Sequence, residues 1–360
     1  MKILYISPEH TVGALSIWKK EHEKRGNECR YVTLYRSASG FEEDICLDLP
    51  LVSAGKFYDN LRNFVYRSHG ELGSKTIKEG YPPVWRPSNS AESLFFKMRE
   101  LIWSSYIKKA IIKHRLSDFD IYHLEWGMEF YRDGRFITEM KKEGKHIVCT
   151  YHGQDMRNRG VIPAIDALSD LNLTSELDLM QKHPDINYLF LPFDTSEFTP
   201  RIEPNELITV SHATRNRRAK GSDDILRICS ELENEGKIKF LFVEDRPHSD
   251  VLEAKAKSDI YIDQITAYGW GYGMNSVEAL SMGAVCFTTM NDQYLNFIPD
   301  NPFVNVTAGN LKSELANLVT DRERIKGKMI ESREWVVKYH DIVSVMDNLY
   351  EYYRKIGIEA

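Results

Sequence analysis

One stretch of the chain decides the fold: DIYIDQITAYGWGYGMNSVEALSMGAVCFT, residues 259–288. It opens with an apolar run of strand character, passes through a loop with glycine at three alternate positions, and continues with helical periodicity. Met282 and Gly283 end that periodicity, as a glycine at a helix C-terminus does, and a second apolar run follows. Strand, glycine-rich loop, helix and strand in this order predict a βαβ unit. Glycines in such a loop let the backbone approach a ligand closely.

The same alternation of short apolar runs and helical patterns extends over most of the 360 residues. Continuous apolar runs are typical of strands that are buried on both faces of a parallel sheet. We therefore expect an α/β protein with two Rossmann-like, doubly wound domains facing each other across a cleft. The expected strands are residues 2–7, 30–34, 120–124, 146–151, 188–191, 207–211, 239–243, 260–263, 285–288 and 303–306, and the main expected helices are 16–25, 222–235, 275–282, 311–321 and 322–358.

A segment rich in proline and polar residues, 191–200, separates two sets of expected strands. Domain boundaries fall in such segments, so we expect one domain over residues 1–192 and another over 193–335. We expect a final helix, 336–360, to pack on its own domain or back on the first. Residues 36–90 have weak periodicity and form an expected insertion, either part of a binding pocket or a variable surface segment.

Composition excludes several classes of protein. The net charge of −6 argues against bulk binding to nucleic acid. There is no apolar stretch long enough to span a membrane and no secretory signal, and the five scattered cysteines have neither zinc nor disulfide spacing. We expect reduced cysteines, no metal site and a cytoplasmic location. Peripheral contact with a membrane stays open.

A basic segment follows the expected strand 207–211. It contains Arg215, Arg217, Arg218 and Lys220, and Gly221 then opens a helix. Strand ends and helix N-termini are where open α/β sheets bind anionic ligands. This predicts a diphosphate site, with Arg217 and Lys220 favoured; a solvated basic loop is the alternative.

The helix of residues 275–282 contains Glu278 between apolar neighbours, where a charge needs a partner. Residues 272–283, YGMNSVEALSMG, together with the Arg-x-x-Lys-Gly pattern of 217–221, resemble the donor-binding signature of GT-B glycosyltransferases of the family 4 type. The resemblance is clear from about residue 207 to 288 and fainter elsewhere.

The resemblance implies a GT-B fold and a nucleotide-diphosphate sugar bound in the second domain without a metal. Arg217 and Lys220 would stabilise the leaving diphosphate, and Glu278 would bind the ribose. The expected donor-binding set is Arg217, Lys220, Asp263, Gly273, Met274, Asn275 and Glu278. One departure is Trp270, which stands where the family usually has a glutamate eight residues before the helical one. Asp263 and Gln264 would then supply polar contacts to the sugar instead.

The first domain would hold the acceptor. The strand 146–151 leads into a polar loop, and the resemblance makes His152, Gly153 and Asp155 contacts to the sugar or the acceptor. His152 joins Arg217 and Lys220 as a candidate catalytic residue, with a structural role about equally open. Gly13, in the loop after the first strand, would allow close approach of the acceptor and the donor phosphate.

These features predict a retaining, hexosyltransferase-type glycosyltransferase, in which "retaining" comes from the resemblance alone. The acceptor is open: a glycan, a lipid-linked sugar or a small molecule. The alternatives are a non-enzymatic binding subunit and a nucleotide-sugar epimerase. An NAD-dependent dehydrogenase is disfavoured because residues 7–13 lack the GxGxxG pattern.

Overall fold

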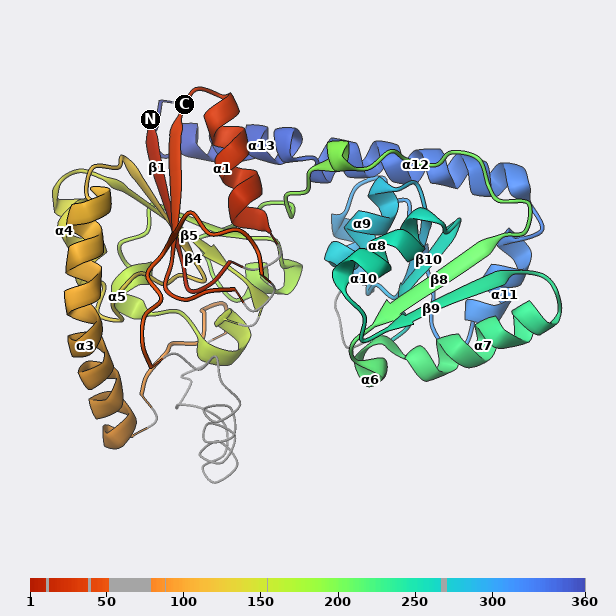
Figure 1. Cartoon of the computed structure of the whole chain (residues 1–360), viewed down its shortest axis with the longest axis horizontal. Helices are drawn as coiled ribbons and strands as arrows, with labels where there is room; N and C mark the ends of the chain where they lie inside the picture. The colour runs from red at the N-terminus through yellow and green to blue at the C-terminus, as the bar shows by residue number, and fades with distance from the viewer. Residues whose placement is uncertain are drawn as a thin grey trace. The chain divides into compact units, whose positions relative to one another are not determined.

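The computed structural model contains two compact α/β units (Figure 1). Unit 1 comprises Met1–Phe190 with Met346–Ala360, and unit 2 comprises Leu191–Val345. We expected the divisions at residues 192 and 335. The structure describes residues 1–10, 13–37, 40–51, 79–87, 89–153, 155–266 and 271–359. The expected insertion at 36–90 falls mainly on residues 52–78, outside the described residues, as does Trp270.

Unit 1 is built on a seven-stranded parallel sheet in the order β3-β2-β1-β4-β5-β6-β7. The strands are β1 (Lys2–Ser7), β2 (Glu28–Thr33), β3 (Ile45–Cys46), β4 (Ile121–Glu125), β5 (His146–Tyr151), β6 (Leu171–Thr174) and β7 (Ile186–Tyr188). Counted along the chain, this is the Rossmann order, which reverses between β1 and β4. Ligands of such sheets bind beyond the carboxyl ends of the strands at that reversal.

The helical segments of unit 1 connect these strands. They are α1 (Ala14–Lys24), α3 (Ser90–His114), α4 (Arg135–Lys142), a π-helical turn (Asp155–Arg159), α5 (Pro163–Asp166), a 3₁₀ turn (Leu177–Gln181) and most of α13 (Ile342–Lys355). Asn89 caps α3 by accepting a hydrogen bond from the Glu92 amide at 2.8 Å. One face of α3 buries Trp103, Ile107 and Ala110. Figure 1 shows α3, in orange, along the outside of the unit.

Unit 2 has a five-stranded parallel sheet in the order β12-β11-β10-β8-β9. Its strands are β8 (Thr209–Thr214), β9 (Lys239–Glu244), β10 (Ile260–Gln264), β11 (Val285–Thr288) and β12 (Val304–Asn305). Numbered within the unit this is the order 2-1-3-4-5 of flavodoxin-like sheets, which reverses between its first and third strands, here β8 and β10.

Helices alternate with the strands of unit 2. They are α6 (Arg217–Lys220), α7 (Ser222–Asn234), α8 (His248–Ala256), α9 (Met274–Ser281), α10 (Asp292–Phe297), α11 (Leu311–Leu318) and α12 (Arg322–His340). A 3₁₀ turn, Thr195–Glu197, precedes them. The stripe Ile225, Ile228 and Leu232 of α7 is buried in the same apolar core as strands β8 and β10.

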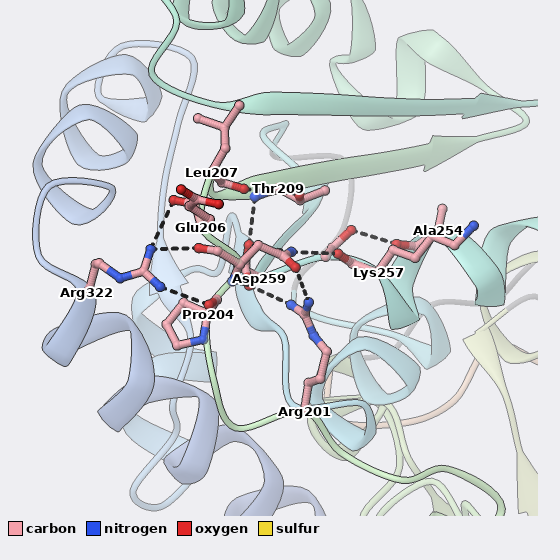
Figure 2. Close-up of polar contacts among 11 residues, drawn as sticks. Arg201, Pro204, Glu206, Leu207, Thr209, Ala254, Lys257, Asp259 and Arg322 are labelled. Carbon is pink, nitrogen blue, oxygen red and sulfur yellow. Dashed lines mark hydrogen bonds and ion pairs between the residues drawn. The ribbon is translucent and has the colours of Figure 1, made fainter.

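A buried carboxylate fixes the amino-terminal edge of this sheet (Figure 2). Asp259, directly before β10, accepts hydrogen bonds from the Thr209 amide at 2.7 Å and from Arg201 Nη2 at 2.5 Å. The Asn205 amide donates to it as well, at 3.0 Å. Arg322 of α12 donates to the carbonyl oxygens of the same segment, which joins it to the sheet. The starts of β8 and β10 are therefore held together, at the edge opposite the one where a ligand is expected.

At the boundary of unit 2, the segment at Phe193 pairs with the segment at residues 340–342. Within unit 2, the Phe193 amide donates to the His340 carbonyl at 2.8 Å, and the Ile342 amide donates back to the Phe193 carbonyl at 2.9 Å. His340 also bonds the Tyr272 hydroxyl at 2.8 Å. Asp341 breaks the expected helix 322–358 into α12 and α13 at this point.

The elements that the sequence patterns missed include β3, β6 and α3. β3 is only two residues long, and β6 carries Asn172 in place of a continuous apolar run. The helix α3 has apolar side chains on two faces, so no single apolar stripe marks it. Among the described residues, no helix combines the length and the apolar character needed to cross a membrane.

Candidate functional site

Most expected donor-binding residues lie at the carboxyl-terminal edge of the unit 2 sheet. β8 leads into α6 and α7, β9 leads into α8, and β10 leads through the glycine-rich loop into α9. Because all these strands are parallel, the starts of the three following helical segments meet at one edge. Lys220, His248 and Asn275 come from these three segments.

Lys220 and Asp263 bridge the reversal between β8 and β10. Lys220 Nζ lies 2.5 Å from Asp263 Oδ1, and Ser276 Oγ donates to Asp263 Oδ2 at 2.7 Å. Asp263 is 1% exposed. Burial opposes its ionisation, but the charge and hydrogen bond of Lys220, with the bond from Ser276, hold the pKa of Asp263 below its usual value. Asp263 therefore positions Lys220, and neither of its oxygens is open to a ligand in this state.

Gly221 is the residue that allows this approach. Its φ is +72°, and a Cβ at this position would lie 2.6 Å from Ile265 Cγ1. The Ile265 amide donates to the Lys220 carbonyl at 3.0 Å, so the end of α6 sits directly on the loop after β10. Only glycine meets both the left-handed backbone and the short contact without strain.

Glu278 has the partners that its apolar surroundings predicted. Lys255 Nζ donates to Glu278 Oε2 at 2.5 Å and to Asn275 Oδ1 at 2.8 Å, and His248 Nε2 lies 2.9 Å from Glu278 Oε1. Lys255 is fully buried, whereas the His248 side chain is 56% exposed. Burial alone would raise the pKa of Glu278, but the bonds from His248 and Lys255 hold it below its usual value.

The Lys255 charge is compensated in turn. Burial lowers the pKa of Lys255, and the neighbouring Glu278 and Asp263 carboxylates oppose that shift. Both carboxylates therefore act on Lys255, while Lys220 bonds Asp263 and His248 bonds Glu278. His248 is the exposed member beside Glu278.

The start of α9 is open. Gly273 precedes it with φ −139°, no side chain caps this helix end in the described part of the chain, and a Cβ on Gly273 would have nothing within 4 Å. Met274 and Asn275 form the first turn, whose amide groups have no acceptor within the helix. Gly271 has a different reason to be glycine, because a Cβ there would lie 2.6 Å from the Tyr294 ring.

Arg217 is not joined to Lys220 in this structure. Its Nε and Nη2 each lie 2.6 Å from a carboxylate oxygen of Glu244, and Nη1 lies 3.2 Å from Asp223. The side chain is 45% exposed. The two cations expected to bind one diphosphate thus have separate carboxylate partners.

In unit 1, His152 pairs with the residue that ends β4. His152 Nε2 lies 2.7 Å from Glu125 Oε2. Burial opposes protonation, but the hydrogen bond and charge of Glu125 raise the pKa of His152 to about 9. The raised pKa favours the imidazolium form of His152, which donates hydrogen bonds. His123 lies two residues before Glu125 in β4, and burial lowers the pKa of its imidazole to about 4.

The expected polar loop after β5 is in fact a π-helical turn, Asp155–Arg159. Asp155 Oδ2 accepts from the His152 amide at 3.0 Å and so holds the start of the turn. A Cβ on Gly153 would lie 1.9 Å from Nη1 of the Arg157 side chain. Arg157 is itself held by Glu176 at 2.7 Å and by Asp178. Asp155 and Gly153 thus shape the backbone around His152.

Gly13 lies at the N-terminus of α1, just beyond β1 at the reversal of the unit 1 sheet. Its φ is +73° and a Cβ would lie 3.3 Å from the Phe41 ring. It lies at the carboxyl edge of the sheet, and its contact with an acceptor stays a prediction. Among the described residues, no group of three or more His, Cys, Asp and Glu side chains could hold a metal ion.

Sequence reasoning missed Lys255, His248 and Ser276. Lys255 stands in an Ala-Lys-Ala-Lys segment that reads as an exposed helix surface. The one available signal was that Glu278 needed a cationic partner, but the sequence did not indicate which residue supplies it.

Solved structures match the chain over nearly its whole length. HepE of Anabaena in complex with UDP-glucose has a TM-score of 0.55 at 11% identity, covering 99% of this chain and 100% of that one. Sucrose-phosphate synthase of Thermosynechococcus elongatus has a TM-score of 0.59 at 10% identity, covering 99% of each chain. TarM of S. aureus, in complex with UDP and other ligands, has a TM-score of 0.59 at 9% identity, covering 98% of this chain and 100% of that one.

The chain has the GT-B fold. The expectation of two parallel-sheet α/β domains of this kind is confirmed. No protein-family model matches the chain, and no curated protein matches it significantly. At identities of 9–11% the likeness of these three structures shows the GT-B fold alone.

Proposed function

We propose that this protein transfers a sugar from a nucleotide-diphosphate sugar to an acceptor. The observation that carries the proposal is the Lys220–Asp263 pair, which places a cation at the reversal of the unit 2 sheet. The neighbours with the GT-B fold include structures with UDP or UDP-glucose bound. A uridine nucleotide is therefore the donor class to test first.

We assign Lys220 to the donor diphosphate. The transition state of glycosyl transfer builds up negative charge on the leaving diphosphate, and a cation already held in place stabilises it. The open amides of Gly273, Met274 and Asn275 are hydrogen-bond donors for a phosphate or a sugar hydroxyl. We assign Glu278 to the ribose. A ribose hydroxyl would replace His248 as the hydrogen-bond partner of Glu278 Oε1. Arg217 would join the diphosphate only after leaving Glu244.

We assign His152 to a sugar or acceptor hydroxyl, as a charged hydrogen-bond donor. Because Glu125 favours the protonated imidazole, the role that we assign to His152 is to orient a group and to stabilise negative charge. The finer features of the proposal are a retaining course, hexosyl transfer, independence from metal ions and membership of the family 4 type. They rest on the motif resemblance at residues 217–221 and 272–283.

The test is titration of the protein with UDP, GDP and their glucose conjugates, with calorimetry and thermal shift as readouts. Binding of one nucleotide should weaken at least tenfold in Lys220→Met and in Glu278→Gln. Lys312→Ala is the matched control, because Lys312 makes a comparable 2.8 Å ion pair with Glu231 at the surface of the same unit. If no nucleotide binds, or if both site variants bind like the wild type, the proposal is wrong.

NMR of the reaction products separates the alternatives. Transfer with unchanged anomeric configuration supports a retaining glycosyltransferase. An altered sugar released without any acceptor would identify an epimerase. Nucleotide binding with no turnover until another protein is added would identify a binding subunit.

A further inference from the structure

Three arginine side chains of unit 1 have buried N–H groups with no hydrogen-bond acceptor among the described residues. Arg99 lies on α3, Arg132 lies between β4 and α4, and Arg159 ends the π-helical turn. Four of their buried nitrogens have no hydrogen-bond partner among the described residues: Arg99 Nε, Arg132 Nε, Arg132 Nη1 and Arg159 Nη1. Buried donors of charged groups are seldom left unpaired, because the cost is high.

Aromatic rings cover the faces of two of these guanidinium groups. The Arg132 guanidinium carbon lies 4.5 Å from the centre of the Trp85 ring and 4.2 Å from that of Phe96. The Arg99 carbon lies 4.2 Å from Trp103 and 4.9 Å from the same Phe96. Stacking stabilises the flat faces of a guanidinium, whose N–H groups match the oxygens of a planar or tetrahedral anion.

Two carboxylates whose charges act on the cluster accept hydrogen bonds from other groups. Glu100 accepts from the Arg132 backbone amide at 2.9 Å and from Arg135 Nη2 at 3.2 Å. Asp155 accepts from the His152 and Met156 amides. Neither therefore pairs with the unpartnered guanidinium nitrogens.

Burial lowers the pKa of all three arginines, and only for Arg132 do neighbouring positive charges add to that shift. Burial, and then the charges of Arg99 and Arg159, lower the pKa of Arg132 to about 9. Burial lowers the pKa of Arg99 to about 10 and lowers that of Arg159 as well. An ion-paired arginine shows the opposite shift, as Arg135 does beside Asp133.

The cluster lies at the same edge of the unit 1 sheet as His152. Arg159 Nη2 donates to the carbonyl oxygen of Trp126, the residue after Glu125 at the end of β4. The Trp126 ring is 6.4 Å from the His152 ring, centre to centre. All three arginines keep some exposed surface, although their four unpartnered nitrogens are buried.

We propose that Arg99, Arg132 and Arg159 bind a phosphate group. Taking this phosphate as part of the sugar acceptor rests on the proposed function and identifies the acceptor as a phosphorylated molecule. Arginine N–H pairs match the oxygens of a phosphate monoester geometrically.

The experiment measures melting temperature with inorganic phosphate, glucose 6-phosphate and glucose, at constant ionic strength. Wild-type protein should be stabilised by both phosphates and not by glucose, since a ligand of the folded state raises its stability. Glucose 6-phosphate acting more strongly than inorganic phosphate supports an acceptor; equal effects restrict the site to the free anion and overturn the acceptor assignment.

Arg132→Met keeps the apolar stem between Trp85 and Phe96 and removes the charge. It should weaken phosphate binding at least tenfold and melt no lower than wild type in phosphate-free buffer. Arg227→Gln, an exposed arginine of unit 2, is the control. If Arg132→Met melts lower than wild type by the same amount with and without phosphate, Arg132 is structural and the proposal is wrong. Titration of the same variant with UDP tests the donor site separately. A failure of the donor site can therefore be told apart from a failure of the anion site.

A second surface is carried by separate observations on the outer face of α3. This face exposes large apolar side chains, with Leu101 77% and Ile112 78% exposed. The other members are Leu94, Phe95, Met98, Ile102 and Tyr106. Lys97, Lys108, Lys109 and Lys113 are exposed on the same helix. Of its two acidic residues, Glu100 is buried and Glu92 half-buried.

Apolar side chains beside lysines, with no fully exposed carboxylate on the helix, match an anionic lipid surface. A second copy of the chain matches less well, because an isologous contact would bring two sets of lysines together. We propose that the outer face of α3 binds the surface of an anionic membrane.

Flotation with vesicles tests this proposal. The protein should bind vesicles of phosphatidylcholine with added phosphatidylglycerol, bind phosphatidylcholine alone much less, and dissociate as salt is raised. Leu101→Glu and the double variant Lys108→Glu/Lys109→Glu should each lose most of the binding, whereas Lys142→Glu on α4 should not. Binding that ignores these changes, or a dimer in solution that Leu101→Glu dissociates, would overturn the proposal.

Discussion

Lys220 Nζ lies 2.5 Å from Asp263 Oδ1, and this contact joins the segment after β8 to the end of β10. The two strands are neighbours at the reversal of the sheet. Asp263 is buried, while the Lys220 side chain is 24% exposed. The pair therefore holds the ammonium group of Lys220 in a fixed position, as the proposed diphosphate site requires.

Removing only one member of this pair should destabilise the protein. Lys220→Met leaves the Asp263 carboxylate buried with Ser276 as its remaining hydrogen-bond donor, and we expect a loss of about 3 kcal/mol in the free energy of unfolding. Lys220→Met combined with Asp263→Asn should recover most of that loss because no charge is left buried. Urea denaturation measures both. Nucleotide binding should stay weak in the double variant; recovered binding there would show that Lys220 acts only through stability.

The two partners of Glu278 should behave differently. Lys255→Met breaks a fully buried ion pair and should cost about 3–5 kcal/mol of stability. His248→Ala removes an exposed partner and should change stability by less than about 1 kcal/mol. If His248 occupies the place of the ribose, His248→Ala should leave nucleoside diphosphate affinity unchanged or raise it. A large loss of affinity would instead make His248 a direct ligand contact.

Stability should fall with rising pH through the titration of His152. Glu125 raises the folded-state pKa of His152 to about 9, above its usual value of 6.5. The folded state therefore binds the proton more tightly, so this contribution is complete below about pH 6.5 and is lost as pH rises through 9. NMR titration of the imidazole Cε1–H signal reports the pKa directly. Glu125→Gln should lower that pKa by more than one unit and flatten the pH dependence of stability over this range.

Two glycines with the same backbone conformation allow a matched test. Gly221 has φ +72° and a Cβ there would lie 2.6 Å from Ile265, whereas Gly236 has φ +70° and nothing within 4 Å. Gly236→Ala should cost about 1 kcal/mol through the left-handed backbone alone. Gly221→Ala should cost about 1–3 kcal/mol more because of overpacking, and should also weaken nucleotide binding by moving Lys220. Equal losses in the two variants would mean that the contact with Ile265 is unimportant.

Much of the architecture was predictable because it depends on local pattern. The expected bounds of β1, β5 and β11 agree with the structure, since each is a nearly continuous apolar run that a parallel sheet buries on both faces. The end of α9 before Gly283 was also predictable from the glycine itself, whose φ is +83°. By contrast, α3 is apolar on two faces and gave no single periodic stripe, so its helical nature was missed.

The candidate site divides in the same way. From the sequence alone, Lys220 belonged at a helix start after a strand, and Glu278 needed a partner in its apolar surroundings. Local composition also placed His152 at a strand end. Each of these statements uses only residues within about one element of each other, which is the range over which periodicity and propensity act.

Only the tertiary structure decided which charged side chains form ion pairs with one another. Lys255 becomes the buried partner of Glu278, Asp263 holds Lys220, and Glu244 takes Arg217. These partners stand 23, 43 and 27 positions apart in the chain. Ion pairs depend on distance in space and on burial, and both are set by the order in which parallel strands assemble rather than by neighbours in sequence.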